Sequence, residues 1–309
     1  MSALSTPNTA PEQSIPHLQT SPVHVKSILM AVDYSDQSIW AAKYAAGLAK
    51  QLQSRLSLLH VVPEEVYMVR PTVLAADLAK FEIERGRNEL KEFTVKIPEV
   101  RTLQHEEIVL CGPAAEMIDR AAETQKADLL VLGSHGRSGV SKLALGSVAE
   151  MVIRHQHRPV LVVGPHCKSR YSPLKSVILA VDLPVTSLRA VQYATSITRQ
   201  SGASLTVVHV VPTKPGEASE GAVTERDVDR ELQMLVPHDP DHAIHVSFKV
   251  LQGDAVAEIL NATETHNARL IVLGAKEQAV MADHAPWNTV SQVIRGADCP
   301  VLVVPPHFA

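Results

Sequence analysis

The sequence predicts two tandem α/β domains, each built around a doubly wound, five-stranded parallel sheet. Three observations carry this prediction. Apolar runs such as "ILMAV" and "LLVLG" are continuous rather than alternating, helix-like segments separate them, and the whole pattern occurs twice. Continuous apolar runs are typical of strands covered on both faces, as in a parallel sheet with helices on each side. A chain of 309 residues has room for about two such domains.

The first copy alternates strands and helices along its whole length. We expect strands at 27–33, 56–62, 104–111, 128–133 and 159–163, and helices at about 36–53, 73–96, 113–126 and 146–156. The order βαβαβαβαβ requires right-handed crossovers and gives a Rossmann-like, doubly wound arrangement.

The charged run from Lys80 to Phe93 is helix-compatible apart from Gly86 and Arg87. We interpret it as a solvated helix face.

The second copy repeats the first with one deletion. "SILMAVDYSDQS" returns as "SVILAVDLPVTS", and "LSLLHVVP" returns as "LTVVHVVP". Asp182 follows Asp33 by 149 positions, whereas Gly253 follows Gly112 by 141, so eight residues are missing between the second and third strands. We expect a disordered tail at 1–22, a first domain at 23–165, a linker at 166–175 and a second domain at 176–309.

Composition excludes several classes of function. The chain is 45% hydrophobic and 20% charged with a net charge of -4, so no overall basic field attracts nucleic acid or an anionic membrane. Three widely spaced cysteines form no disulfide framework and no metal-ligand spacing. No apolar stretch approaches the ~18 residues of a membrane span, and the N-terminus does not resemble a signal peptide. We expect a cytoplasmic protein.

A glycine-rich stretch, "VLGSHGRSGVSKLALGS", is the strongest candidate for a binding site. Gly133-x-x-Gly136 is followed after nine residues by Gly146-Ser147, which leads into a helix. Glycines let a ligand approach the backbone, and a helix N-terminus offers free N–H groups to an anion. These features favour a polyphosphate site. Two alternatives stay open: Ser147 and Glu150 form a capping box, and the glycines form a flexible surface loop.

This loop, with "AVD" in the first strand and "HVV" in the second, resembles the universal stress protein family across residues 25–306. The resemblance implies five-stranded α/β domains and a first copy that binds ATP, with or without Mg²⁺. It assigns Asp33 to the adenine end with Ala31 and Val32 beside it, the Val61 backbone to the base, Gly112, Leu132 and Gly133 to the ribose, and His135, Gly136, Gly146, Ser147 and Val148 to the phosphates.

The residues themselves leave the role of Asp33 open. A carboxylate at a strand end can accept hydrogen bonds from a ribose hydroxyl or an adenine amine. It can equally cap the next helix, a role for which Ser35 and Asp36 compete. His60 and His209 recur at equivalent strand ends, where each either lines the ligand edge or bonds to the backbone.

The second copy has lost the phosphate features. Glu277, Trp287 and Asn288 replace Gly136, Gly146 and Ser147. A carboxylate then stands where a phosphate would lie, and an indole replaces the glycine that lets the backbone approach. We expect a degenerate, non-binding domain in which Asn288 still caps its helix.

The resemblance implies a nucleotide-dependent regulator of the stress response, with protein partners that the sequence does not identify and with slow, incidental ATP hydrolysis at most. The alternatives are an enzyme acting on the α-phosphate of ATP and an interaction scaffold that binds no nucleotide.

The resemblance also bears on assembly, because family members commonly pair through their last strand. Here we expect Pro159–Val163 to pair with Pro300–Val304 as a pseudo-dimer within one chain, with a homodimer as the alternative.

Overall fold

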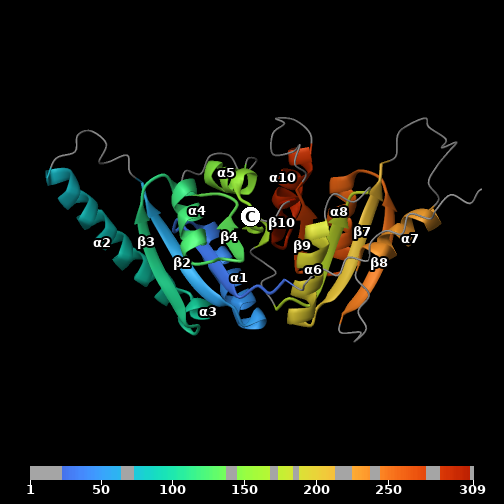
Figure 1. The fold of residues 1–309 in the computed structure, drawn as a ribbon, viewed down its shortest axis with the longest axis horizontal. Helices are drawn as coiled ribbons and strands as arrows, with labels where there is room; N and C mark the ends of the chain where they lie inside the picture. Colours follow the sequence, from blue (N-terminus) through green and yellow to red (C-terminus); the bar gives the residue numbers. More distant parts are fainter. Residues whose placement is uncertain are drawn as a thin grey trace, which may run out of the picture.

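The computed structural model describes residues 23–63, 73–136, 145–167, 173–183, 188–212, 225–236, 244–275 and 286–306. Its strands form one ten-stranded sheet in the order β3-β2-β1-β4-β5-β10-β9-β6-β7-β8 (Figure 1). The strands are β1 Ser27–Val32, β2 Arg55–Val62, β3 His105–Cys111, β4 Leu129–Gly133, β5 Val160–Val163, β6 Ser176–Val181, β7 Ser204–Val211, β8 His245–Gln252, β9 Leu270–Gly274 and β10 Val301–Val304.

The two halves have the same strand order and the same parallel pairing, which confirms the predicted fold class. The described helices are α1 Asp36–Leu52, α2 Val73–Lys96, α3 Pro98–Arg101, α4 Ala114–Thr124, α5 Ser147–His155, α6 Leu188–Ser201, α7 Glu225–Leu235, α8 Ala255–Thr265 and α10 Pro286–Gly296. The short α3 was not predicted. It begins at Pro98, whose fixed φ suits the first position of a helix.

Helices cover both faces of the sheet, and each face has its own core. Buried side chains of α1, α2, α6 and α7 pack on one face, and those of α4, α5, α8 and α10 pack on the other. Along β4, Leu129 and Val131 belong to the first core, whereas Leu130 and Leu132 belong to the second. Both faces of such a strand are therefore covered, which explains why its sequence is continuously apolar.

Helix α2 matches the predicted helix at 73–96 and runs without interruption through Gly86 and Arg87, the two residues that fitted the helix pattern least. The reason lies in its packing. A Cβ on Gly86 would lie 3.2 Å from Val109 Cγ1, 3.3 Å from Val62 Cγ2 and 3.4 Å from His60 Cδ2. Glycine here allows α2 to approach β2 and β3 closely, so it serves helix–sheet packing rather than helix termination.

The halves join through their last strands. β5 and β10 pair antiparallel, with Val301 opposite Val162, so the predicted pseudo-dimer within one chain is confirmed. In Figure 1 the first half, coloured blue to green, and the second, coloured yellow to red, lie on either side of these strands. The buried Arg189 of α6 supports the junction by donating to the carbonyls of His157, at 2.7 Å, and Pro305, at 3.3 Å.

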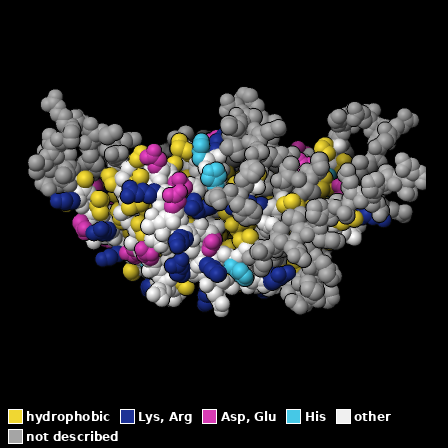
Figure 2. All heavy atoms as spheres, viewed as in Figure 1, with side chains coloured by type: hydrophobic (Ala, Val, Ile, Leu, Met, Phe, Trp, Pro, Cys, Tyr) yellow, Lys and Arg dark blue, Asp and Glu magenta, His cyan; other side chains and the backbone are white. Residues whose placement is uncertain are grey.

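The described part of the chain contains no helix with the length and apolar character needed to cross a membrane. On the face shown in Figure 2, Lys and Arg side chains lie among Asp and Glu side chains over the first half. The charges on this face are therefore mixed rather than of one sign, in keeping with the small net charge of the sequence.

Candidate functional site

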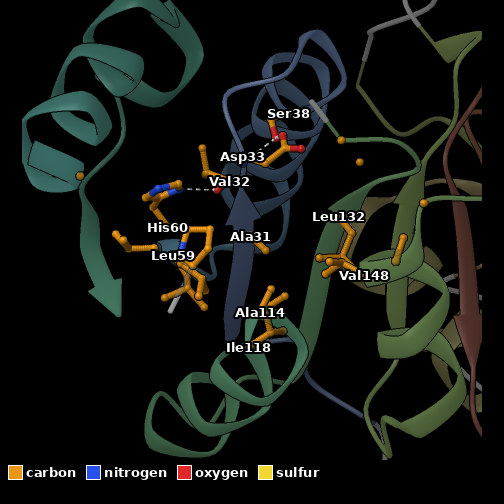
Figure 3. A pocket seen from close by; sticks show the side chains of 18 of the residues that line it. Ala31, Val32, Asp33, Ser38, Leu59, His60, Ala114, Ile118, Leu132 and Val148 are labelled. Atoms are coloured by element: carbon orange, nitrogen blue, oxygen red, sulfur yellow. Dashed lines mark hydrogen bonds between the residues drawn. The ribbon is translucent and has the colours of Figure 1, made fainter. Parts of the chain in front are cut away.

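A cavity of about 570 Å³ opens at the carboxyl edge of the first half's strands (Figure 3). This edge of a doubly wound sheet is where such folds bind ligands, at the point where the strand order reverses. Of the twelve predicted site residues, eleven line the cavity: Ala31, Val32, Asp33, Val61, Leu132, Gly133, His135, Gly136, Gly146, Ser147 and Val148. Gly112 does not line it and instead forms the turn into α4, with a φ of 146°.

The carboxylate of Asp33 is fixed by the turn between β1 and α1. Its Oδ1 accepts from the backbone N–H of Ser35 at 3.0 Å, from Ser35 Oγ at 2.6 Å and from Ser38 Oγ. Ser35 is the N-cap of α1, because its Oγ accepts from Ser38 N–H. The capping role is therefore taken by Ser35, and Asp33 Oδ2 faces Gly136, whose Cβ position would lie 2.6 Å away.

The glycine rim and α5 meet at one side of the cavity. Gly146 N–H donates to Ser134 O at 2.8 Å, and α5 begins at the next residue. The first N–H groups of α5 have no partner within their own helix, which makes this end of the cavity suited to an anion. Residues 137–144, which include Arg137 and Lys142, lie outside the described part of the chain.

The predicted capping box of Ser147 and Glu150 is wrong. The N-cap of α5 is Gly146, which makes no side-chain capping bond, and Ser147 is the first helical residue. Glu150 instead bonds to Arg154 one turn later, with 3.0 Å between Oε1 and Nε. Because Ser147 does not cap the helix, its hydroxyl group remains a lining group of the cavity.

His135 presents an unsatisfied polar atom at the same rim. Its Nδ1 lies 2.8 Å from Ser134 Oγ, whereas its Nε2 is buried and has no hydrogen-bond partner among the described residues. A buried polar atom without a partner is destabilising by about 1–3 kcal/mol. A ligand group that reached Nε2 would remove this penalty.

The backbone of β2 provides an acceptor at the other side of the cavity. Arg55 N–H donates to Lys26 O, and Gly112 N–H donates to Val62 O, so Val61 directs its backbone groups toward β1. The strand β1 ends at Val32, the register partner of His60. The Val61 carbonyl therefore points beyond the end of β1, into the region that the cavity occupies.

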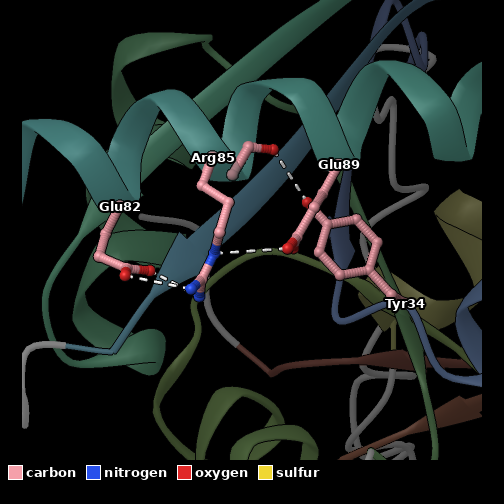
Figure 4. Close-up of polar contacts among 5 residues, drawn as sticks. Tyr34, Glu82, Arg85 and Glu89 are labelled. Carbon is pink, nitrogen blue, oxygen red and sulfur yellow. Dashed lines mark hydrogen bonds and ion pairs between the residues drawn. The ribbon is translucent and has the colours of Figure 1, made fainter.

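Four lining residues come from α2, and sequence reasoning missed all of them: Glu82, Arg85, Gly86 and Glu89. This part of α2 is not simply the solvated face that we expected. Figure 4 shows Arg85 between Glu82 and Glu89. Arg85 Nη1 lies 3.1 Å from Glu82 Oε1, and Arg85 Nε lies 3.4 Å from Glu89 Oε1. The sequence shows that Glu82, Arg85 and Glu89 are spaced to pair along one side of a helix, but it does not show that this side faces the cavity.

Tyr34 connects α2 to the end of β1. Its hydroxyl group donates to Gly86 O at 3.1 Å (Figure 4), and its ring centroid lies 4.4 Å from that of His60. His60 does both things that the sequence allowed: it lines the cavity, and its Nδ1 atom lies 2.8 Å from the backbone oxygen of Val32. Because Tyr34 follows Asp33 directly, these contacts fix the position of α2 relative to the Asp33 carboxylate.

Comparison with known protein families agrees with this geometry. The family model described as "Universal stress protein family" matches residues 24–164 and again residues 173–305. The chain belongs to the universal stress protein family. Its two matches place one universal stress protein domain in each half of the ten-stranded sheet.

Relatives match one domain at a time. Universal stress protein MJ0531 of Methanocaldococcus jannaschii is 37% identical over 142 residues, 45% of this chain and 81% of the relative. Universal stress protein YxiE of Bacillus subtilis is 36% identical over 144 residues, 44% of this chain and 97% of the relative. A universal stress protein structure from Archaeoglobus fulgidus superposes with a TM-score of 0.63 at 21% identity, covering 91% of this chain and 97% of its own. That likeness supports the tandem fold.

The second universal stress protein domain keeps the strand-end geometry of the first. His209 Nδ1 lies 3.0 Å from Val181 O, and Gly253 has the same φ of 146° as Gly112. Glu277 lies outside the described residues. The helix α10 begins at Pro286, so Asn288 lies in its first turn, and the prediction that Asn288 caps this helix is wrong. Proline is favoured at the first position of a helix, which explains the earlier start.

Proposed function

We propose that the first domain binds ATP, with or without Mg²⁺, and that the chain acts as a nucleotide-dependent regulator of the stress response. The single observation that carries the proposal is the rim where Gly136, Gly146 and the N-terminus of α5 meet the buried Nε2 of His135, which has no hydrogen-bond partner in the described part of the chain. Backbone N–H groups at a helix N-terminus favour phosphate, and a protonated Nε2 can donate to a phosphate oxygen.

The cavity favours a nucleotide whose phosphates lie at α5 and whose base lies at β2. Polyphosphate at the glycine rim puts the ribose near Asp33 and the base against the apolar wall that Leu59, Ala114 and Ile118 provide. The Val61 carbonyl then accepts a hydrogen bond from the exocyclic amine of adenine. Apolar side chains suit the flat faces of a base, and a small number of polar groups fix its orientation.

Nucleotide carried through purification tests the proposal. Protein purified without added nucleotide is heat-denatured, and the released small molecules are separated by anion exchange. We expect ATP in the released fraction. AMP together with ATP turnover would point to an enzyme acting on the α-phosphate. If no nucleotide is released and added Mg-ATP does not bind, the domain is an interaction scaffold and the proposal is wrong.

A further inference from the structure

A second cavity, of about 550 Å³, lies where the two halves of the chain meet. The C-terminal part of α1, from Tyr44 to Gln51, forms one wall, and α1 and α6 are neighbours across the junction (Figure 1). Leu161 of β5, Leu270 of β9 and Pro300 before β10 belong to the other walls. Because both halves contribute, the cavity exists only in the joined chain. It shares no described lining residue with the cavity of the first domain.

The walls of this junction cavity combine apolar side chains with positive charge. Its charged groups are Lys50 and Arg269, and no Asp or Glu is among the described lining residues. The amide of Gln51 already bonds to protein, since Nε2 donates to Leu174 O at 2.8 Å and to Ser201 O at 3.0 Å. The leucine and proline side chains of the lining are those of Leu48, Leu161, Pro173, Leu174, Leu270 and Pro300.

The internal duplication gives the junction cavity a counterpart with a different charge. At the equivalent positions, Arg199 replaces Lys50 and Asp128 replaces Arg269. The Asp128 carboxylate accepts from two backbone N–H groups next to the start of β1, at 2.8 Å and 3.0 Å. Arg269 has no acceptor for such bonds. The fold is therefore built equally well with one charge of each sign at these positions, and it does not require two cations.

The counterpart also differs in how the chain lies against the helix. There Val23 N–H donates to Ser196 Oγ at 3.1 Å, and Gln200 Nε2 donates to Val23 O at 3.1 Å. A backbone segment is thus bonded directly to α6. At the junction cavity, Gly47 stands in place of Ser196 and has no hydroxyl group with which to hold a segment in this way.

We propose that the junction cavity binds a small amphipathic anion, a carboxylate with an apolar chain of medium length. The planar guanidinium of Arg269 matches a carboxylate in two parallel hydrogen bonds, and the Lys50 ammonium adds a second charge. The leucine and proline side chains take the apolar chain out of water. The volume lies within the range of small-molecule sites, about 300–1,000 Å³. This inference is independent of the proposed binding of ATP, because it uses a different cavity.

Decanoate, kept below its micelle-forming concentration, is the probe, and isothermal titration of the full chain measures its affinity. The test variant is Lys50→Gln/Arg269→Gln. Its matched control, Lys26→Gln/Arg199→Gln, removes two cations from exposed positions that do not line the cavity. Acetate, which lacks the apolar chain, and decanol, which lacks the charge, are titrated alongside. Thermal unfolding is recorded for each protein with and without decanoate.

We expect the wild type and the control to bind decanoate, and the test variant to bind it at least about tenfold more weakly, the effect of losing a hydrogen bond to a charged group. Acetate and decanol should bind more weakly than decanoate. Decanoate should raise the melting temperature of the wild type, because it binds the folded state alone. If Arg269→Gln destabilises the fold, Lys50→Gln alone, at an exposed position, should still weaken binding.

Failure of the wild type to bind decanoate would overturn the inference, as would an equal loss of affinity in the control variant. Displacement of decanoate by Mg-ATP would also overturn it, because the probe would then lie in the first cavity. Loss of decanoate binding with ATP still bound leaves the proposed function intact, and the reverse result leaves this inference intact.

Discussion

His135 and Asp33 are the two residues whose local geometry most supports a ligand site in the first domain. We predicted Asp33 as a site residue because it follows an apolar strand. The structure places it in the cavity wall, where its Oδ1 atom accepts hydrogen bonds from the hydroxyl groups of Ser35 and Ser38. The sequence could not decide between Asp33 and Ser35 as the cap of α1, because both residue types cap helices. Only the geometry of the turn assigns that role to Ser35.

Gly136→Ala tests the close approach between the rim and Asp33. A Cβ at this position would lie 2.6 Å from Asp33 Oδ2, so the carboxylate or the rim must shift. We expect Mg-ATP affinity to fall about tenfold, the effect of one lost charged hydrogen bond, with little change in thermal stability because Gly136 is exposed. Isothermal titration and a thermal melt measure the two quantities.

The mechanism of that loss is tested by repeating Gly136→Ala in an Asp33→Ala background. Removal of the carboxylate relieves the contact, so the added loss of affinity should shrink in the double variant. An equal loss in both backgrounds would show that the contact with Asp33 is not the cause.

Strands were easier to predict than the faces of helices. The strands β1 and β4 are buried on both faces, and their continuous apolar runs indicate this directly. The helix α2 is different, because Glu82 and Glu84 are alike in sequence and only packing turns one toward the cavity. The Ser147–Glu150 pattern fits a capping box equally well wherever the helix starts, so it could not locate the N-cap at Gly146.

Gly86→Val tests the close packing of α2 on the sheet. The new side chain would meet Val109, Val62 and His60, whose atoms already lie 3.2–3.4 Å from the position of a Cβ. We expect the free energy of unfolding to fall by about 1–3 kcal/mol through overpacking. Urea denaturation measures this change.

The control for Gly86→Val is Glu84→Val, which puts the same side chain on the exposed face of α2. There the variant changes helix propensity and removes the exposed ion pair with Arg87, two effects that together cost about 1 kcal/mol or less. Equal destabilisation by the two variants would contradict the close packing of Gly86.

At the scale of the whole molecule, the internal duplication was the most informative feature of the sequence. It predicted the tandem α/β architecture. The pairing of the last strands was implied by the resemblance to the family, and the structure confirms it as the antiparallel junction of β5 and β10. The continuity of ten strands follows from that junction. The contribution of Arg189 was not predictable, because the carbonyls that it bonds, those of His157 and Pro305, come from distant parts of the chain.

Hydrogen exchange tests the junction. The strands β5 and β10 lie at the centre of the sheet with every residue buried, so their amides should exchange among the slowest in the protein. The edge strands β3 and β8 are the internal control and should exchange faster, since each pairs on one side. Exchange of β5 and β10 as fast as that of the edges would mean that the halves separate readily in solution.

The central claim is that one domain of the two binds ATP, and the stoichiometry of Mg-ATP binding tests it most directly. The account predicts about one site per chain by isothermal titration, since by sequence only the first copy has the glycines at positions 136 and 146, where the second copy has Glu277 and Trp287. Gly146→Trp copies Trp287 into the first domain, where the added side chain would begin 3.2 Å from Ser134 O at the rim. This variant should bind almost no ATP while its circular dichroism spectrum stays unchanged. Two sites in the wild type, or undiminished binding by Gly146→Trp, would contradict the account.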